Sequence, residues 1–123
     1  MSGNSILIDT NIALYVLSGD QDLSGLLLDK KLYVSFVTQL ELLGYTEISE
    51  KEKEKVQAFL DDCVVIDINA RIKEEVIKIR KSKKIKLPDS IILATSKYLN
   101  IPVMSSDKEF TKAGEVHVIH YQK

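Results

Sequence analysis

The chain has 123 residues, of which 45% are hydrophobic and 28% charged, and its formal net charge is −1. This length fits one domain spanning residues 1–123, and the apolar content excludes a disordered chain, while the near-zero charge leaves any nucleic-acid surface to a local cluster of cations. The one cysteine excludes an internal disulfide and suits a reducing cytoplasm, and no window approaches the roughly 20 apolar residues that span a bilayer.

The first predicted element is a buried strand that ends on three polar residues. Residues 5–8 read SILI, and Asp9, Thr10 and Asn11 follow directly. All three are good helix N-cap residues, and a helix is predicted over 10–17. The carboxyl end of a buried strand is also where α/β proteins bind ligands. Capping and ligand binding are compatible roles for Asp9.

Short apolar runs alternate with longer amphipathic segments along the rest of the chain. Asn69 and Pro88 suit the first turns of two of the helices. The strands are rich in Val and Ile without alternation, as in strands covered on both faces. This alternation predicts one α/β domain with a mainly parallel five-stranded sheet. After the first strand and helix, the predicted strands are 32–35, 63–66, 102–105 and 116–120, and the predicted helices are 20–29, 36–47, 50–62, 69–83 and 88–99.

Glu41 lies in the middle of the predicted helix 36–47, so an N-cap role does not explain it. It shares a helical stripe with Val37, Leu40 and Gly44. A buried glutamate in this stripe needs a partner or a cation, whereas a glutamate at the exposed edge of the stripe needs neither. Both alternatives are open from the sequence.

Two further aspartates lie near predicted element ends. Asp107 follows strand 102–105, and Asp89 is in the first turn of helix 88–99. Each could simply cap or complement its own helix. If both point toward the edge where Asp9 lies, the like charges would be unfavourable without a cation. Such oxygen ligands favour Mg²⁺ or Mn²⁺, and the absence of a nearby histidine in the sequence disfavours zinc or non-haem iron.

Three segments carry a resemblance to a known family. They are ILIDTN at 6–11, SFVTQLELLGY at 35–45 and LPDSIILATSKYLNIPVMSSDKEF at 87–110, and a closing strand follows them. In this order the chain resembles the PIN-domain ribonucleases of the VapC toxin type, over essentially its whole length. The resemblance implies a PIN-like three-layer α/β/α domain around the five-stranded sheet.

The resemblance also implies a set of site residues. Many relatives have an arginine just before the last acid, whereas this chain has Ser106. This departure leaves open how the scissile phosphate is held. Carried over by position, the catalytic and metal-binding acids are Asp9, Glu41, Asp89 and Asp107, and the supporting polar residues are Thr10, Asn11 and Ser105.

The activity implied by the resemblance is endonucleolytic cleavage of RNA with Mg²⁺ or Mn²⁺, in which a metal-activated water attacks the phosphorus. The implied partners are an RNA substrate, a cognate antitoxin protein and a second copy of the chain, in the cytoplasm and without a membrane. Helices 10–17 and 36–47 are apolar beyond one stripe, which fits a protein partner. A small α/β core that uses both faces of these helices would explain the same pattern.

The segment KIRKSKKIK, residues 78–86, is a dense run of cations that contains no acid and leads directly to Asp89. One interpretation is a solvated helix end, because Lys and Arg favour a helix C-terminus. The other is a strip that follows the phosphates of RNA beside the metal site. The candidate RNA-binding residues are Arg80, Lys81, Lys83, Lys84 and Lys86.

Two alternatives from other functional classes remain at this stage. A response-regulator receiver is also a small α/β domain, and VVIDIN at 64–69 would place a phosphoacceptor at Asp67. A receiver, however, has adjacent acids after its first strand, and here Thr10 follows Asp9. The second alternative is a non-catalytic PIN-like binding module, against which the complete set of four acids argues.

Overall fold

The computed structural model describes residues 4–123, so residues 1–3 of the predicted domain lie outside the described residues. Its centre is a five-stranded sheet in the order β3-β2-β1-β4-β5, and every neighbouring pair of strands is parallel. This confirms the prediction of a parallel α/β sheet. The strands are β1 (Ser5–Ile8), β2 (Lys31–Ser35), β3 (Val64–Ile66), β4 (Val103–Ser105) and β5 (Val118–His120).

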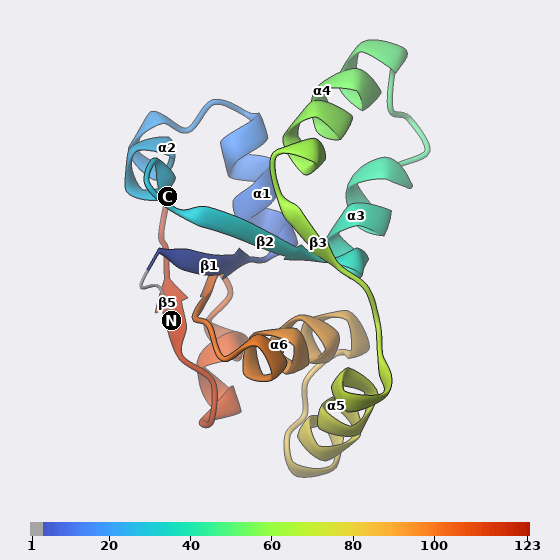
Figure 1. The fold of residues 1–123 in the computed structure, drawn as a ribbon, viewed down its shortest axis with the longest axis vertical. Helices are drawn as coiled ribbons and strands as arrows, with labels where there is room; N and C mark the ends of the chain where they lie inside the picture. The colour runs from blue at the N-terminus through green and yellow to red at the C-terminus, as the bar shows by residue number, and fades with distance from the viewer. Residues whose placement is uncertain (1–3) are drawn as a thin grey trace.

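Helices cover both faces of the sheet and form the outer layers (Figure 1). From β1 the chain moves outward to β2 and β3, and then returns to the other side of β1 as β4. Because crossovers between parallel strands are right-handed, this reversal of direction places the later helices on the opposite face. Figure 1 shows α1 to α4 on one side of the sheet and α5 and α6 on the other. The helices are α1 (Thr10–Leu17), α2 (Gln21–Leu27), α3 (Phe36–Leu43), α4 (Glu50–Asp61), α5 (Ala70–Ser82) and α6 (Leu87–Leu99), and a 3₁₀ helix, η1, spans Lys108–Ala113.

The central strand β1 contributes to a hydrophobic core on each face. Leu7 packs in the core beneath α5 and α6, whereas Ile6 and Ile8 pack in the core beneath α1, α2 and α4. All three side chains are at most 2% exposed. Alternate residues of a strand point to opposite faces, so a continuous apolar run is what a doubly covered strand requires. Burial of each such side chain contributes about 1.5–3 kcal/mol, which fixes the end of β1 in space.

The predicted caps agree with the structure better than the predicted ends of elements. Asn69 caps α5 by accepting a hydrogen bond from Ile72 N at 2.8 Å, and Pro88 lies in the first turn of α6. The prediction of a helix through residue 47 was wrong, because α3 ends at Leu43 with Gly44 as its C-cap. The predicted helix 20–29 ends at Leu27, and the last strand begins only at Val118. None of the helices within residues 4–123 is long and apolar enough to cross a membrane.

Candidate active site

The candidate site lies at the carboxyl edge of the three central strands. β1 pairs with β2 on one side and with β4 on the other, so their C-terminal ends lie side by side. The chain reverses its direction across the sheet between β1 and β4, which is the topological switch point where open α/β sheets bind ligands. Asp9 follows β1 directly, α3 begins directly after β2, and Asp107 follows β4.

Asp9 is a buried carboxylate, 4% exposed, and both of its oxygens accept hydrogen bonds. Oδ1 accepts from the backbone N–H of Ile12 at 2.9 Å and so caps α1, while Oδ2 accepts from Ser105 Oγ at 2.5 Å. Burial raises the pKa of Asp9 above its ordinary value; the two hydrogen bonds oppose this, and the charges of Asp89 and Asp107 add to it. Asp9 therefore caps its helix and also lies in a field of like charges.

Ser105 connects the acid after β1 to the acid after β4. Its hydroxyl donates to Asp9 and accepts a hydrogen bond from the backbone N–H of Asp107 at 2.9 Å. Asp107 in turn caps η1 by accepting from Glu109 N, also at 2.9 Å. Ser105 is 0% exposed, so one buried hydroxyl fixes the positions of two acids that are far apart in sequence.

Glu41 projects from α3 on the exposed side of the helix, so of the two alternatives the exposed edge of the stripe is the one observed. Leu40, assigned to that stripe, is 61% exposed. The carboxylate still has a partner, because Thr10 Oγ1 donates to Glu41 Oε1 at 2.5 Å. Thr10 Oγ1 also lies 3.0 Å from the hydroxyl of Thr38, which is completely buried. Residues at positions i and i+3 share one face of a helix, so the spacing of Thr38 and Glu41 was a signal that the sequence analysis missed.

Asp89 completes the cluster from the first turn of α6. It is half-buried, and burial raises the pKa of its carboxyl group; the charges of Asp107 and Glu41 raise it further, and Lys86 opposes them. Asp89 is the acid in the first turn of α6, where its charge also complements the positive end of the helix. The structure thus brings all four predicted acids into one electrostatic environment.

The donor set suits a hard divalent cation, although the side chains do not form a ready cage. Among residues 4–123, no group of three or more His, Cys, Asp or Glu side chains is placed so that it could hold an ion. Mg²⁺ is usually held by one or two carboxylates, with waters filling the remaining positions. Each carboxylate oxygen has two lone pairs, so those that accept hydrogen bonds can still bind a cation. Four mutually repelling acids fit this mode of binding.

The other predicted site residues divide into those in contact with the acids and those elsewhere. Thr10 and Ser105 make the hydrogen bonds described above. Asn11 is exposed, and within the described part of the chain its side chain makes no hydrogen bond to any of the four acids. In the basic run, Lys86 lies near Asp89, whereas Arg80 is engaged in holding its own loop.

Comparison with family models decides the family. The model described as PIN domain matches residues 6–116. The chain belongs to the PIN-domain family. No curated protein sequence matched it.

Several solved structures share the fold at low sequence identity. A chain from the crystal structure of VapBC2 from Rickettsia felis bound to a DNA fragment from their promoter is 19% identical, with a TM-score of 0.81 over 96% of this chain and 99% of that one. A chain from VapBC-1 of nontypeable Haemophilus influenzae is 20% identical, with a TM-score of 0.84 over 94% of this chain and 97% of that one. A chain from a toxin–antitoxin complex of Klebsiella pneumoniae is 26% identical, with a TM-score of 0.79 over 93% of this chain and 95% of that one.

Membership of the PIN family excludes the receiver alternative. Asp67, the phosphoacceptor of that alternative, is an exposed residue after the edge strand β3, and its carboxylate accepts only from its neighbour Ile68 N, at 3.3 Å. The predicted three-layer PIN-like fold is confirmed by the topology and by the structural matches.

Proposed function

We propose that this PIN domain is a Mg²⁺- or Mn²⁺-dependent endoribonuclease and the toxin of a toxin–antitoxin pair. The observation that carries the proposal is the buried Asp9, which Ser105 ties to Asp107 at the switch point, with Asp89 and Glu41 in the same field of charge. Acids are placed against one another in this way when a cation compensates their repulsion.

One or two of the four acids would hold the cation directly, with waters in its remaining positions, and the hydroxyl groups would orient Asp9 and Glu41. When bound, such an ion lowers the pKa of a coordinated water and stabilises negative charge on phosphate oxygens. Ser105 and the Ile12 N–H fix the two oxygens of Asp9, and Thr10 fixes one oxygen of Glu41. A fixed carboxylate loses less freedom when it binds the ion, so these hydrogen bonds prepare the site.

The test is cleavage of single-stranded RNA with Mg²⁺, with Mn²⁺ and with EDTA. Asp9→Asn and Asp89→Asn should each abolish cleavage, because each removes one charged ligand and keeps the shape of the side chain. Asp67→Asn is the matched control, since it removes an exposed acid at the sheet edge, and it should cut as the wild type does. If the wild type does not cut RNA with either metal, the chain is the non-catalytic binding module instead.

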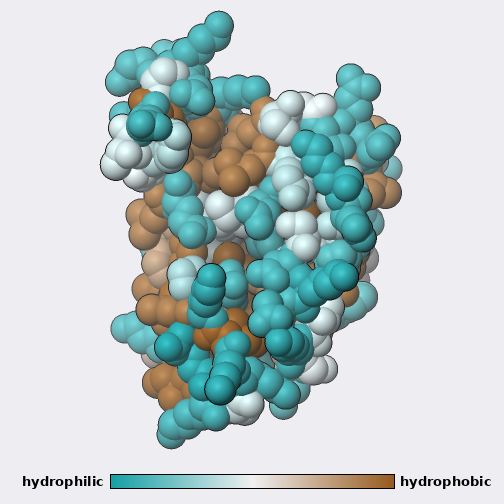
Figure 2. All heavy atoms as spheres, turned by 180° about the vertical axis from the view of Figure 1, so that it is seen from behind, coloured by the Kyte–Doolittle hydropathy of each residue, from teal (hydrophilic) through white to brown (hydrophobic). Residues whose placement is uncertain are grey.

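A groove between α1, α3 and α4 is the surface that we assign to the antitoxin. Its volume is about 310 Å³, and it ends at Thr10 and Glu41 beside the acid cluster. Figure 2, seen from behind the view of Figure 1, shows hydrophobic side chains gathered in the upper part of the molecule, beside a more hydrophilic region at the top. The relatives described above come from toxin–antitoxin complexes, and an apolar groove fits an apolar face of a partner chain. The apolar lining is Leu14, Leu42, Tyr45, Ile48 and Val56.

Co-purification with the product of a small gene adjacent to this one tests the groove. Leu14 lines the groove and is 47% exposed. In Leu14→Lys the partner would bury a charge at this position, so this variant should no longer bind the partner. Leu28→Lys alters a leucine that is 81% exposed and does not line the groove, and this variant should keep the partner. If Leu14→Lys instead dissociates a homodimer in light scattering, the groove is occupied by a second copy of the chain.

A further inference from the structure

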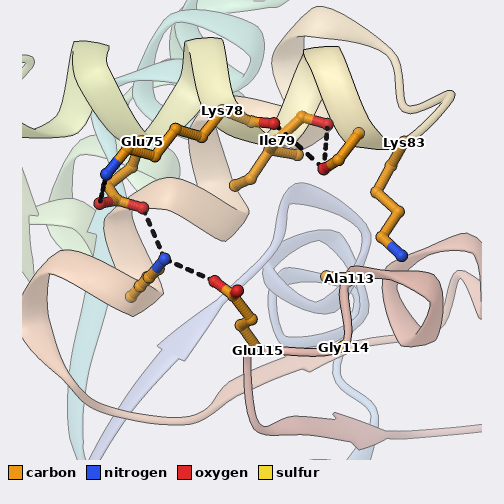
Figure 3. Close-up of a pocket in the computed structure, with 9 residues that line it drawn as sticks. Glu75, Lys78, Ile79, Lys83, Ala113, Gly114 and Glu115 are labelled. Atoms are coloured by element: carbon orange, nitrogen blue, oxygen red, sulfur yellow. Dashed lines mark hydrogen bonds and ion pairs between the residues drawn. The ribbon is translucent and has the colours of Figure 1, made fainter.

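The cations around α5 fall into two groups, those that are neutralised and those that are free. Lys97 pairs with Glu75 at 2.8 Å and with Glu115 at 2.6 Å, and Lys78 lies 3.6 Å from Glu75. These ion pairs line a hollow of about 390 Å³ between α5, α6 and the loop before β5 (Figure 3). Lys83 stands at the side of this hollow, and Figure 3 shows no interaction at its amino group. The neutralised cations therefore lie on one side of the basic run, and the free ones lie toward the α5–α6 turn.

The α5–α6 turn, residues 83–86, is held rigidly by its one apolar residue. The Ile85 side chain is 7% exposed and packs in the core beneath α5 and α6. Its carbonyl accepts hydrogen bonds from Arg80 Nη1 at 3.1 Å and from Ser90 Oγ at 3.3 Å. Arg80 thus positions the turn through one of its five N–H donors, and its exposed side chain also lines the surface that the lysines of the turn share.

The three lysines of the turn are exposed and share a concave surface. Lys83, Lys84 and Lys86 line a shallow hollow of about 540 Å³, and the amino group of none of them makes an ion pair or hydrogen bond with another described residue. Lys86 lies close enough to Asp89 to oppose the rise in the pKa of that carboxyl group. Free cations on a rigid turn that leads to the acid cluster are the arrangement that a polyanion would bind with little loss of conformational entropy.

We propose that the α5–α6 turn binds the phosphate backbone of single-stranded RNA on one side of the cleavage site, with Lys86 nearest to Asp89 and with Lys84 and Lys83 farther along the strand. This inference rests on the proposed function and extends it to the path of the substrate. It also predicts that binding at the turn depends on backbone charge and not on base sequence, because lysine amino groups contact phosphates.

The test compares RNA binding at several salt concentrations in EDTA, where no cleavage occurs. The probe is a fluorescein-labelled single-stranded RNA of mixed sequence, and the readout is fluorescence anisotropy. Each phosphate contact on a single strand contributes about 0.7 to the slope of log K against log salt. The variant Lys83→Gln/Lys84→Gln should therefore lower the slope by about 1.4. Lys86 is left intact, so the surroundings of Asp89 do not change.

A charge-matched variant separates local contacts from net charge. Lys53→Gln/Lys55→Gln removes two exposed lysines from α4, on the opposite face of the sheet (Figure 1), and should leave the slope unchanged. Equal slopes for the wild type and Lys83→Gln/Lys84→Gln, or no binding by the wild type at low salt, would overturn the proposal. Cleavage with Mg²⁺ is measured separately. If the wild type cuts RNA but its salt slope equals that of Lys83→Gln/Lys84→Gln, the proposed function stands and only the proposed RNA path along the turn is refuted. If the slopes are as expected but the wild type does not cut RNA, the proposed RNA path stands and only the proposed function is refuted.

Discussion

Removal of the Ser105 hydroxyl should weaken the connection between the two strand-end acids. In Ser105→Ala, Asp9 Oδ2 loses its donor at 2.5 Å and the Asp107 N–H loses its acceptor at 2.9 Å. Hydrogen bonds to charged groups contribute about 1.5–3 kcal/mol, whereas neutral ones contribute about 0.5–1.5 kcal/mol. The Asp107 N–H is only partly buried, so water can replace that acceptor. We expect a loss of about 2 kcal/mol in the free energy of unfolding at pH 7.

The pH dependence of this loss separates the charged hydrogen bond from a simple packing defect. Ser105 lowers the pKa of Asp9 against the effect of burial, so in the variant the pKa of the folded state rises further. The loss is fully present above both folded-state pKa values, and it shrinks as the pH falls through them, because a protonated Asp9 no longer needs an ionic partner.

Urea unfolding between pH 4 and 8 in EDTA measures this effect, and Ser96→Ala is the matched control. Ser96 is another buried serine, 1% exposed, and its hydroxyl donates to the Ile101 carbonyl at 2.5 Å, with no acid as its partner. That variant should lose about 1 kcal/mol, by the same amount at every pH in this range. A loss in Ser105→Ala that does not change with pH would refute the assigned role of the hydroxyl.

Three further predictions concern stability in the absence of metal. Asp9→Asn keeps the α1 cap and removes a buried carboxylate whose pKa is raised, so in urea titrations its free energy of unfolding at pH 7 should equal or exceed that of the wild type. Asp9→Ala also loses the cap, so its free energy of unfolding should be about 1 kcal/mol lower than that of Asp9→Asn. Gly44→Ala should destabilise by about 1–3 kcal/mol in thermal unfolding, since its Cβ would lie 2.5 Å from Leu40 O, whereas Gly25→Ala, with no atom within 4 Å, should be neutral or stabilising. Lys97→Met should lower the free energy of unfolding at pH 7, because it removes the ion pairs with Glu75 and Glu115. The difference from the wild type should shrink below pH 4.5, where these two glutamates, whose pKa values are lowered, become protonated.

The sequence predicts the five strands and six α-helices because each has a local signal. The apolar run before Asp9, the Asn69 cap and Pro88 all act within a few residues, and all agree with the structure. The orientation of α3 has no such signal. Leu40 is exposed toward solvent and Leu42 is buried, because α3 begins at the residue after β2 and its rotation is set by that strand. A stripe of leucines cannot show which of them faces the sheet when several positions are apolar.

The geometry of the candidate site depends on contacts between distant segments. The order of the strands determines that Asp9 and Asp107 are neighbours, and local patterns do not encode which strand lies beside β1. The spacing of Thr38 and Glu41 places both on one face of α3, but the contact of Thr38 with Thr10, 28 positions away, is not encoded locally. The helix η1 was missed because a six-residue 3₁₀ helix is too short to have an amphipathic period.

The placement of β1 has a consequence for the synthesis of the protein. Of the five strands of the sheet, β1 is made first, and yet one of its two neighbours, β4, is made fourth. Ser105 lies 96 positions after Asp9, an interval that takes about 5–20 s at ordinary rates of translation. Until then β1 lacks β4 at its side, and Asp9 lacks its hydroxyl donor and Asp107. A chain that stops before β4 therefore lacks part of the candidate site, and the strand-end acids come together only after β4 has been made.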